Sequence, residues 1–236
     1  MSAGGGLSTS IDAFRRHLDV LDEWGAVVLP LGEAMERLAV GTLPDRAVAL
    51  TFDDGYASVV ETAWPLLRER RLDATLFAVP GYLDRTARFA WDATEPDDGR
   101  PRLIDRGELV AVAADGLDIG SHTVTHPWLP HLEAVEVQQE LSDSKSQLED
   151  LLARPITSIA YPMGGWNATV RAAAAAAGYK IGVTVDRGRT RMVRDPMTVL
   201  GAFAPESDAD FRLVLDGAYT WLRALDSWRI RNGPRW

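Results

Sequence analysis

Residues 47–56 form an apolar run that ends in two adjacent carboxylates and a glycine, Ala47-Val48-Ala49-Leu50-Thr51-Phe52-Asp53-Asp54-Gly55-Tyr56. A short apolar run with a polar start and a glycine after it is typical of a buried strand in a parallel sheet. Because α/β folds place their chemistry at the carboxyl ends of such strands, Asp53 and Asp54 are candidate site residues. Adjacent strand residues point to opposite faces, so both acids reach one site only if the chain turns at Gly55. A solvated turn is the alternative interpretation.

A second stretch carries two of the four histidines four positions apart, Leu117-Asp118-Ile119-Gly120-Ser121-His122-Thr123-Val124-Thr125-His126-Pro127. Pro127 disfavours a helix through His126, so we expect a tight loop or a single turn. One aspartate and two histidines would form a three-ligand metal set with open positions for water, as in catalytic sites. Such ligands suit zinc, and also iron or cobalt. Two polar loop histidines without a metal are the alternative.

These two stretches resemble the first two motifs of the NodB-homology polysaccharide deacetylases, also called carbohydrate esterase family four. The matching residues are 51–55 and 121–126, in the family's order and separation, and residues 159–164 resemble the third motif. The resemblance covers residues 11–222. It implies an α/β fold, specifically a distorted or incomplete (β/α)7 barrel.

The resemblance also implies the roles of individual residues. Asp53 matches the general base, and the metal ligands match Asp54, His122 and His126. The backbone N–H of Met163 matches the donor that stabilises the oxyanion. The implied cofactor is a divalent metal, with zinc expected and cobalt or another divalent ion as alternatives.

Further substrate contacts are expected around the third motif. Pro162 and Gly164 match one wall of the substrate groove, and we expect Tyr161 and Trp166 to contribute to the same wall. Trp91 lies in a long segment without clear periodicity, and long loops in compact domains are often functional. Its ring can stack on a sugar or anchor the loop to the core, and the sequence leaves both possibilities open.

The chemistry of these residues fits hydrolysis. A divalent metal polarises an amide or ester carbonyl and lowers the pKa of its water, and a neighbouring carboxylate such as Asp53 can accept the proton. Like charge beside Asp54 favours protonation of Asp53, but a bound cation reverses this effect and keeps both acids ionised. The metal and one backbone N–H can together stabilise the developing negative charge.

The chain departs from the family pattern at three positions. An arginine that often begins the third motif is replaced by Ala160, and Asp186 is a weak candidate for the acidic partner of that arginine. The usual Leu-x-His motif near the end is replaced by a segment that ends in Asp216 and has no histidine. We therefore consider His131 and Asp216 as possible general acids, with a surface role as the alternative for His131.

The function expected from these observations is hydrolysis of the acetamide of N-acetylated amino sugars, a reaction on carbon–nitrogen bonds other than peptide bonds. The substrate would be an oligo- or polysaccharide. O-deacetylation or hydrolysis of a small non-polymeric amide is the first alternative, because an ester leaving group needs less protonation. An inactive carbohydrate-binding protein is the alternative of another class, and retention of Asp53 argues against it.

Composition limits the possible partners and locations. The 236 residues carry a net charge of −9, which disfavours binding to nucleic acid or anionic membranes. The absence of cysteine excludes disulfides and thiolate ligands. There is no apolar run long enough to span a bilayer and no signal-peptide pattern in residues 1–10, so we expect a cytoplasmic protein or a trimmed form of an exported one. The oligomeric state stays open.

Periodicity predicts alternating strands and helices in one domain. Residues 1–10 form a Gly/Ser-rich lead-in, residues 11–225 form the catalytic domain and residues 226–236 form a tail. Strands are predicted to begin near residues 26, 47, 74, 118, 158, 180 and 198. Helices are predicted between them and at both ends, over residues 11–24, 31–40, 59–71, 105–114, 133–153, 168–177 and 208–225. His17 on the first helix is interpreted as structural or exposed. This alternation implies a parallel sheet.

Overall fold

The computed structural model describes residues 9–84, 89–94, 101–190, 195–218 and 220. The tail and most of the lead-in lie outside these residues. The helices are α1 (Ile11–Trp24), α2 (Leu31–Ala39), α3 (Trp64–Glu69), α4 (Arg106–Ala114), α5 (Ala134–Leu152), α6 (Ala168–Ala176) and α7 (Asp208–Asp216). The strands are β1 (Val27–Val28), β2 (Ala47–Val48), β3 (Thr51–Phe52), β4 (Thr75–Ala78), β5 (Asp118–Ser121), β6 (Ser158–Ala160), β7 (Ile181–Arg187) and β8 (Val199–Gly201).

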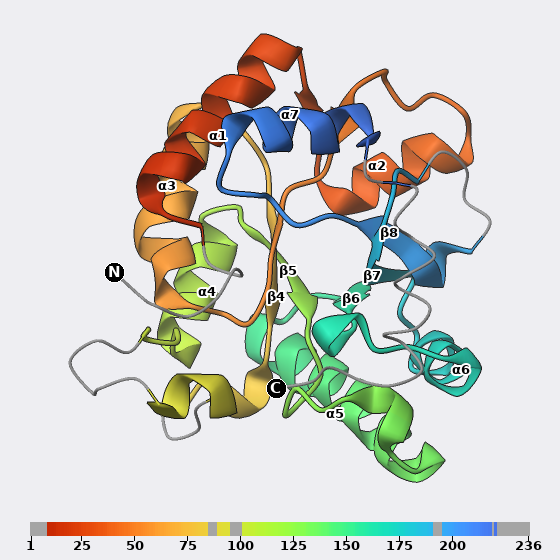
Figure 1. Ribbon diagram of the computed structural model, residues 1–236. Coiled ribbons are helices and arrows are strands. Elements are labelled where there is room, and N and C mark those ends of the chain that lie inside the picture. Colours follow the sequence, from red (N-terminus) through yellow and green to blue (C-terminus); the bar gives the residue numbers. More distant parts are fainter. Residues whose placement is uncertain (1–8, 85–88, 95–100, 191–194, 219, 221–236) are drawn as a thin grey trace.

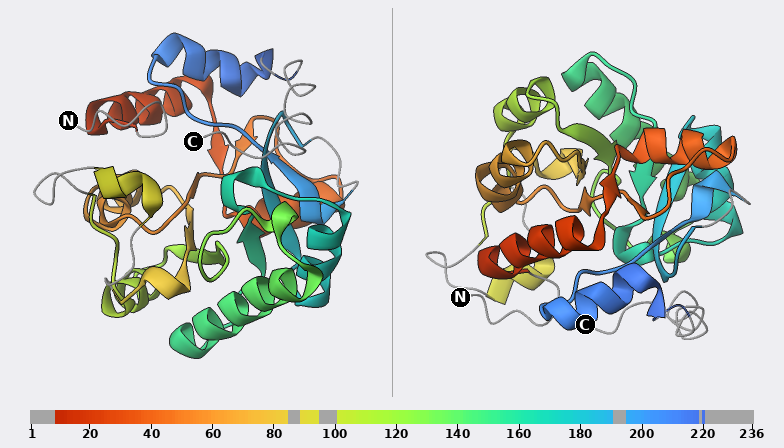
Figure 2. Two further views of the ribbon diagram at one scale, coloured as in Figure 1. Left: turned by 60° about the horizontal axis from the view of Figure 1, so that its bottom comes forward. Right: turned by 90° about the horizontal axis from the view of Figure 1, so that it is seen from above.

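The main sheet contains six parallel strands in the order of the sequence, from β3 at one edge to β8 at the other. β1 pairs with β2 in a separate parallel sheet, and the chain runs from β2 into β3. The strand predicted from residue 47 is therefore divided into β2 and β3, which lie in different sheets. When these two are counted as one position, the strands occupy the seven predicted positions. The sheet curls and the helices surround it (Figures 1 and 2), which confirms the expected incomplete (β/α)7 barrel.

The central strands β4, β5 and β6 are buried on both faces, as expected for a parallel sheet. Phe77 of β4 faces an inner cluster with Ala160 and Ile181, to which α2 adds Leu31 and Met35. The neighbouring residues on β4 and β6 alternate to the other face and join the larger cluster under the helices, including Leu76, Ala78 and Ile159. The two-residue period of a strand thus divides one apolar run between two cores.

Two helices begin at side chains that cap their free backbone N–H groups. Asp105 forms a capping box with Glu108, and Asn167 accepts a hydrogen bond from the Val170 N–H at 2.9 Å. Residues 59–63 form a π-helical turn before α3. Pro65 follows this turn and has no N–H to donate to the carbonyl of Glu61, which explains why the helix is widened there.

The end of α7 corrects one prediction. The helix predicted over residues 208–225 ends at Asp216, because Gly217 adopts a left-handed conformation (φ 79°) and its N–H caps the preceding turn. α7 packs beside α1 (Figure 1), where His17 is buried and its ring stacks on Phe211 at 4.2 Å, so His17 is structural. Within the described part of the chain, no helix combines the length and hydropathy needed to cross a membrane.

Candidate metal centre

The three predicted motifs follow the carboxyl ends of β3, β5 and β6. β4 lies between β3 and β5, and β5 pairs directly with β6 through Ser121 and Ile159. Two strand spacings amount to about 10 Å, a gap that side chains from β3 and β5 can close from both sides. After β3 the chain turns sharply, since Asp54 (φ 73°) and Gly55 (φ 80°) are both left-handed. This turn confirms the predicted break at Gly55.

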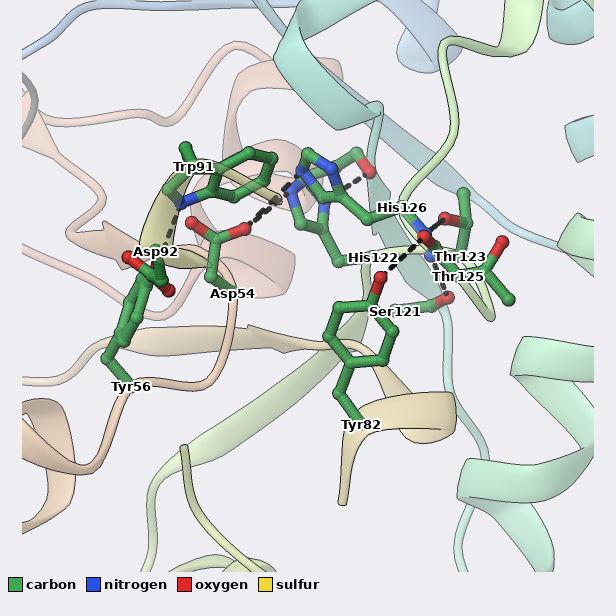
Figure 3. Close-up of polar contacts among 11 residues, drawn as sticks. Asp54, Tyr56, Tyr82, Trp91, Asp92, Ser121, His122, Thr123, Thr125 and His126 are labelled. Carbon is green, nitrogen blue, oxygen red and sulfur yellow. Dashed lines mark hydrogen bonds and ion pairs between the residues drawn. The ribbon is translucent and has the colours of Figure 1, made fainter. Parts of the chain in front are cut away.

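Asp54, His122 and His126 converge on one point (Figure 3). Asp54 Oδ1 lies 3.6 Å from Nε2 of His122 and 3.4 Å from Nε2 of His126. Tetrahedral zinc ligands at about 2.0–2.2 Å from the ion lie about 3.3–3.6 Å from one another, so these separations fit a shared ion. Among the described residues, the buried Asp54 Oδ1 has no hydrogen-bond donor. The three residues can therefore hold a metal.

The hydrogen bond of His122 sets its tautomer. Nδ1 lies 2.8 Å from the carbonyl oxygen of Ala160, which can only accept, so Nδ1 carries the proton and Nε2 has a free lone pair. Burial lowers the pKa of His122 to about 4. Burial and the neighbouring His122 lower the pKa of His126 to about 2. Both imidazoles are thus neutral near pH 7, which is the form that binds a metal.

The two acids have raised pKa values in the metal-free protein. Burial raises the pKa of Asp54 to about 8, and the charges of Asp53 and Asp92 contribute in the same direction. Asp53 is partly exposed, but the surrounding protein atoms desolvate its carboxylate. This desolvation raises the pKa of Asp53 to about 6. A bound cation would reverse these shifts by favouring both carboxylates.

An aromatic group lines one side of the triad. Trp91 stacks on buried Phe89 with ring centroids 4.5 Å apart, and its ring lies 5.1 Å from that of His126. The indole Nε1 donates to the hydroxyl of Tyr56 at 2.9 Å, and that hydroxyl donates to Asp92 Oδ2 at 2.8 Å. Figure 3 shows Trp91 beside Asp54 and the imidazoles. Trp91 is thus anchored by three neighbours and still 40% exposed.

The third motif lies beside His122, and its residues differ in their burial. Met163 is half-buried with a left-handed backbone (φ 55°), in the short helix η5 (Pro162–Gly164). Pro162 and Gly164 are buried. The side chain of Tyr161 is buried and its hydroxyl donates to the Met197 carbonyl at 3.0 Å, which corrects the expectation that this side chain contacts substrate.

Trp166 follows the third motif and is half-buried. Its Nε1 donates to Oδ2 of Asp186 on β7 at 3.1 Å. Asp186, considered above as the partner of a missing arginine, is thus paired with a tryptophan.

The two candidate general acids occupy different places. His131 is exposed on the short helix η4 (Leu129–His131), with its ring 6.2 Å from that of Trp128. Asp216 accepts a hydrogen bond from Trp24 Nε1 at 2.9 Å, and the Trp24 carbonyl accepts one from Arg46, just before β2. The Trp24 ring also lies under the guanidinium of Arg189, which follows β7, with 5.7 Å between the guanidinium carbon and the ring centroid. Asp216 therefore stays a candidate acid whose described hydrogen bond is to Trp24.

Sequence reasoning did not select Tyr56, Phe89, Asp92 or Glu140, although all four lie around the triad or its loop. Tyr56 follows the Asp-Asp-Gly turn directly, and that adjacency was the available signal. Nothing in the spacing connects Tyr56 with Asp92, which is 36 positions away.

Comparison with solved structures shows the same fold in other proteins, one of which is a deacetylase. The Streptococcus pyogenes deacetylase PplD in complex with acetate superposes with a TM-score of 0.79 at 24% identity, covering 91% of this chain and 92% of that one. The structure of IcaB from Ammonifex degensii has a TM-score of 0.74 at 22% identity, covering 88% of each chain.

Sequence comparison places the chain in a family. The polysaccharide deacetylase family model matches residues 40–182, and the chain belongs to this family. The protein YxkH of Bacillus subtilis (strain 168) is 29% identical over 189 residues, which cover 80% of this chain and 62% of that protein. A chitooligosaccharide deacetylase of Rhizobium leguminosarum bv. trifolii is 27% identical over 127 residues, 53% of this chain and 50% of that enzyme. The chain thus matches only part of the length of each relative.

Proposed function

We propose that the protein is a metal-dependent hydrolase that removes acetyl groups from N-acetylated amino sugars in an oligo- or polysaccharide. One observation carries the proposal: Asp54, His122 and His126 present three ligand atoms to one point, and Asp53 is the residue next to the ligand Asp54. A metal-binding module without activity has no need of a second carboxylate in that position. The family of the chain and its relative among chitooligosaccharide deacetylases support the same reaction class.

A divalent metal in this site would polarise the acetyl carbonyl and acidify the attacking water. Asp53 takes the proton from that water as general base, and its exposure leaves it accessible from the substrate side. The backbone N–H of Met163 donates to the oxygen on which negative charge develops. His122 stays in the productive tautomer because Ala160 accepts its Nδ1 proton.

The aromatic side of the site supports a carbohydrate substrate. Trp91 is held by Phe89 and Tyr56 and keeps an exposed face, so the ring is rigid before substrate arrives. Stacking of a sugar on a rigid aromatic ring costs little ordering. In this proposal, Trp91 both anchors its loop and forms the platform, which unites the two roles that the sequence left open.

An O-acetyl esterase is the second candidate, and the surroundings of the two candidate acids favour it. Asp216 already accepts a hydrogen bond from Trp24, and His131 is exposed on η4. An alcohol leaves more readily than an amine without protonation, so a site with weak acid catalysis would lose less on esters.

The test is acetate release from N-acetylglucosamine oligomers and from O-acetylated xylan. Each substrate is incubated with chelated protein, with added zinc or cobalt, and with Asp53→Asn as the matched control that retains the ligands. Metal-dependent release from the oligomers, absent in Asp53→Asn, is the expected result. Release from xylan alone would support the esterase, and zinc binding without release from either substrate would contradict both proposals.

A further inference from the structure

Glu140 of α5 contacts the loop that connects the two histidine ligands. Its Oε2 accepts hydrogen bonds from the backbone N–H groups of Val124 at 2.8 Å and Thr125 at 3.0 Å. Its Oε1 accepts from the hydroxyl of Thr125 at 2.6 Å. Both carboxylate oxygens are therefore used on residues between His122 and His126. α5 supplies no ligand to the triad. Its described hydrogen bonds to this region come from Glu140 and from Ser144, whose hydroxyl accepts from Ser121 at 2.9 Å.

The loop has a backbone that needs outside support. Thr123 (φ 65°) and His126 (φ 59°) both adopt left-handed conformations. Such conformations each cost about 1–3 kcal/mol and persist only where neighbouring contacts determine them. Without a rigid loop, the imidazole of His126 would not keep its Nε2 directed at Asp54.

Other contacts hold the opposite side of the same loop. The Val124 carbonyl accepts from the Gly81 N–H at 3.1 Å, and the Thr125 carbonyl accepts from the Tyr82 hydroxyl at 3.3 Å. Within the loop, Thr123 Oγ1 accepts from the His126 N–H at 3.1 Å. The contacts from Gly81 and Tyr82 bind carbonyl groups, whereas Glu140 binds the N–H groups of the same two residues.

Glu140 is also the charged member of this set. It is half-buried, so solvent screens its hydrogen bonds less than it would at an exposed position. Hydrogen bonds to an ionised acceptor are about twice as strong as neutral ones. The carboxylate therefore dominates the interactions that fix the loop.

We propose that Glu140 is a positioning residue that sets the metal affinity of the site by fixing the loop that carries His126. It acts through the loop and touches neither substrate nor metal. This inference rests on the metal-dependent function proposed above.

The experiment measures the zinc dissociation constant by competition with a chromogenic chelator. Glu140→Gln removes the negative charge and one acceptor oxygen. The two backbone N–H groups then share a neutral amide oxygen, and the NH2 group can only donate to the Thr125 hydroxyl. Disrupting the support of a metal ligand lowers affinity by about 10–100-fold, and we expect a loss in this range. Activity should fall at limiting zinc and return toward the wild-type kcat at saturating zinc, because the reacting groups are intact.

Glu149→Gln is the matched control on the same helix. Glu149 also accepts a backbone hydrogen bond, from the Ile156 N–H at 2.8 Å, and it pairs with Lys145, but it lies away from the histidine loop. This variant should lose thermal stability and keep its zinc affinity within about twofold, as expected for an effect confined to the helix end. Thr125→Val removes only the exposed hydroxyl that donates to Glu140 Oε1 and keeps the two backbone hydrogen bonds. We therefore expect a smaller loss of zinc affinity than in Glu140→Gln.

The outcomes separate this inference from the function. Wild-type protein that binds no zinc would overturn the proposed metal dependence itself. Wild-type affinity in Glu140→Gln would overturn the role of Glu140 and leave the function standing. Equal loss of affinity in Glu140→Gln and Glu149→Gln would also overturn the inference, because it would assign the effect to general helix stability. If Glu140→Gln does not fold, unchanged affinity in Thr125→Val would overturn the inference.

Discussion

His122 donates its Nδ1 proton to the main-chain carbonyl of Ala160, 2.8 Å away and 38 positions later in the sequence. The strand of the third motif thereby orients a candidate metal ligand of the second motif. The contact uses a main-chain oxygen and is independent of the side chain at position 160. Replacement of the usual arginine by Ala160 therefore leaves the orientation of His122 intact.

The three ligands should be essential for metal binding. We expect Asp54→Asn, His122→Ala and His126→Ala each to weaken zinc binding by more than about 100-fold, because loss of a supporting residue alone costs up to that factor. Metal content after dialysis against trace zinc measures the effect. A variant that retained one zinc per chain would remove that residue from the ligand set.

Replacement of Asp53 should lower the catalytic rate and leave metal binding unchanged. We expect Asp53→Asn to lower kcat by about 10²–10⁴-fold, the usual contribution of a general base. Its zinc dissociation constant should stay near that of the wild type, because its carboxylate is not among the three ligand atoms. Parallel measurements of kcat and zinc affinity check this separation, and full activity in the variant would exclude the assigned role.

Stability of the metal-free protein should fall as the pH rises from about 6.5 to about 8. Burial raises the pKa of Asp54 to about 8, whereas an aspartate in the unfolded chain has a pKa of about 4. The native state thus holds a proton that the unfolded state has lost, so stability decreases with pH in this window. The buried His122 and His126 have the opposite effect, but only below their unfolded pKa of about 6.5.

Urea unfolding in chelator at pH 6.5 and pH 8.5 measures this effect. We expect the free energy of unfolding to drop by up to roughly 2 kcal/mol, because about 1.5 pH units separate pH 6.5 from the pKa of Asp54 and each unit contributes about 1.4 kcal/mol. Asp54→Asn should remove the dependence, because an amide does not titrate. Zinc should also flatten the profile, since the cation stabilises the carboxylate. A pH-independent wild type would contradict the raised pKa of Asp54.

Trp91 should affect substrate affinity for oligomers. We expect Trp91→Ala to raise KM about 2–10-fold, in line with a contribution of about 0.5–1.5 kcal/mol from one aromatic contact. Trp91→Phe is the control, because it keeps stacking and loses only the hydrogen bond to Tyr56. An unchanged KM in Trp91→Ala, with loss of stability alone, would assign the ring to anchoring its loop.

Much of the fold could be predicted from local pattern. The seven strand positions, the caps at Asp105 and Asn167 and the turn at Gly55 follow from periodicity and from the chemistry of single residue types. The helix end at Asp216 was missed, because apolar periodicity continues in the sequence past Gly217, whose left-handed conformation ends the helix.

The candidate site could be predicted only in part. The sequence identified the residues whose side chains can ligate a metal, since carboxylate and imidazole at strand ends carry that chemistry themselves. The side chain of Tyr161 was misjudged, because its neighbours in the core decide which way it points. The hydrogen bond between Asp216 and Trp24, 192 positions apart, could not be read from the sequence.

The amino-acid sequence by itself determined the order of strands and helices, the three residues that can hold a metal and the neighbouring Asp53. These depend on residue type and short spacing. Only the tertiary structure decided that the Ala160 carbonyl orients His122, that Glu140 holds the histidine loop and that Tyr56 and Asp92 accompany Trp91. Such contacts join distant segments, often through main-chain atoms that every residue possesses, so they exist only once the curled sheet brings its strand ends together.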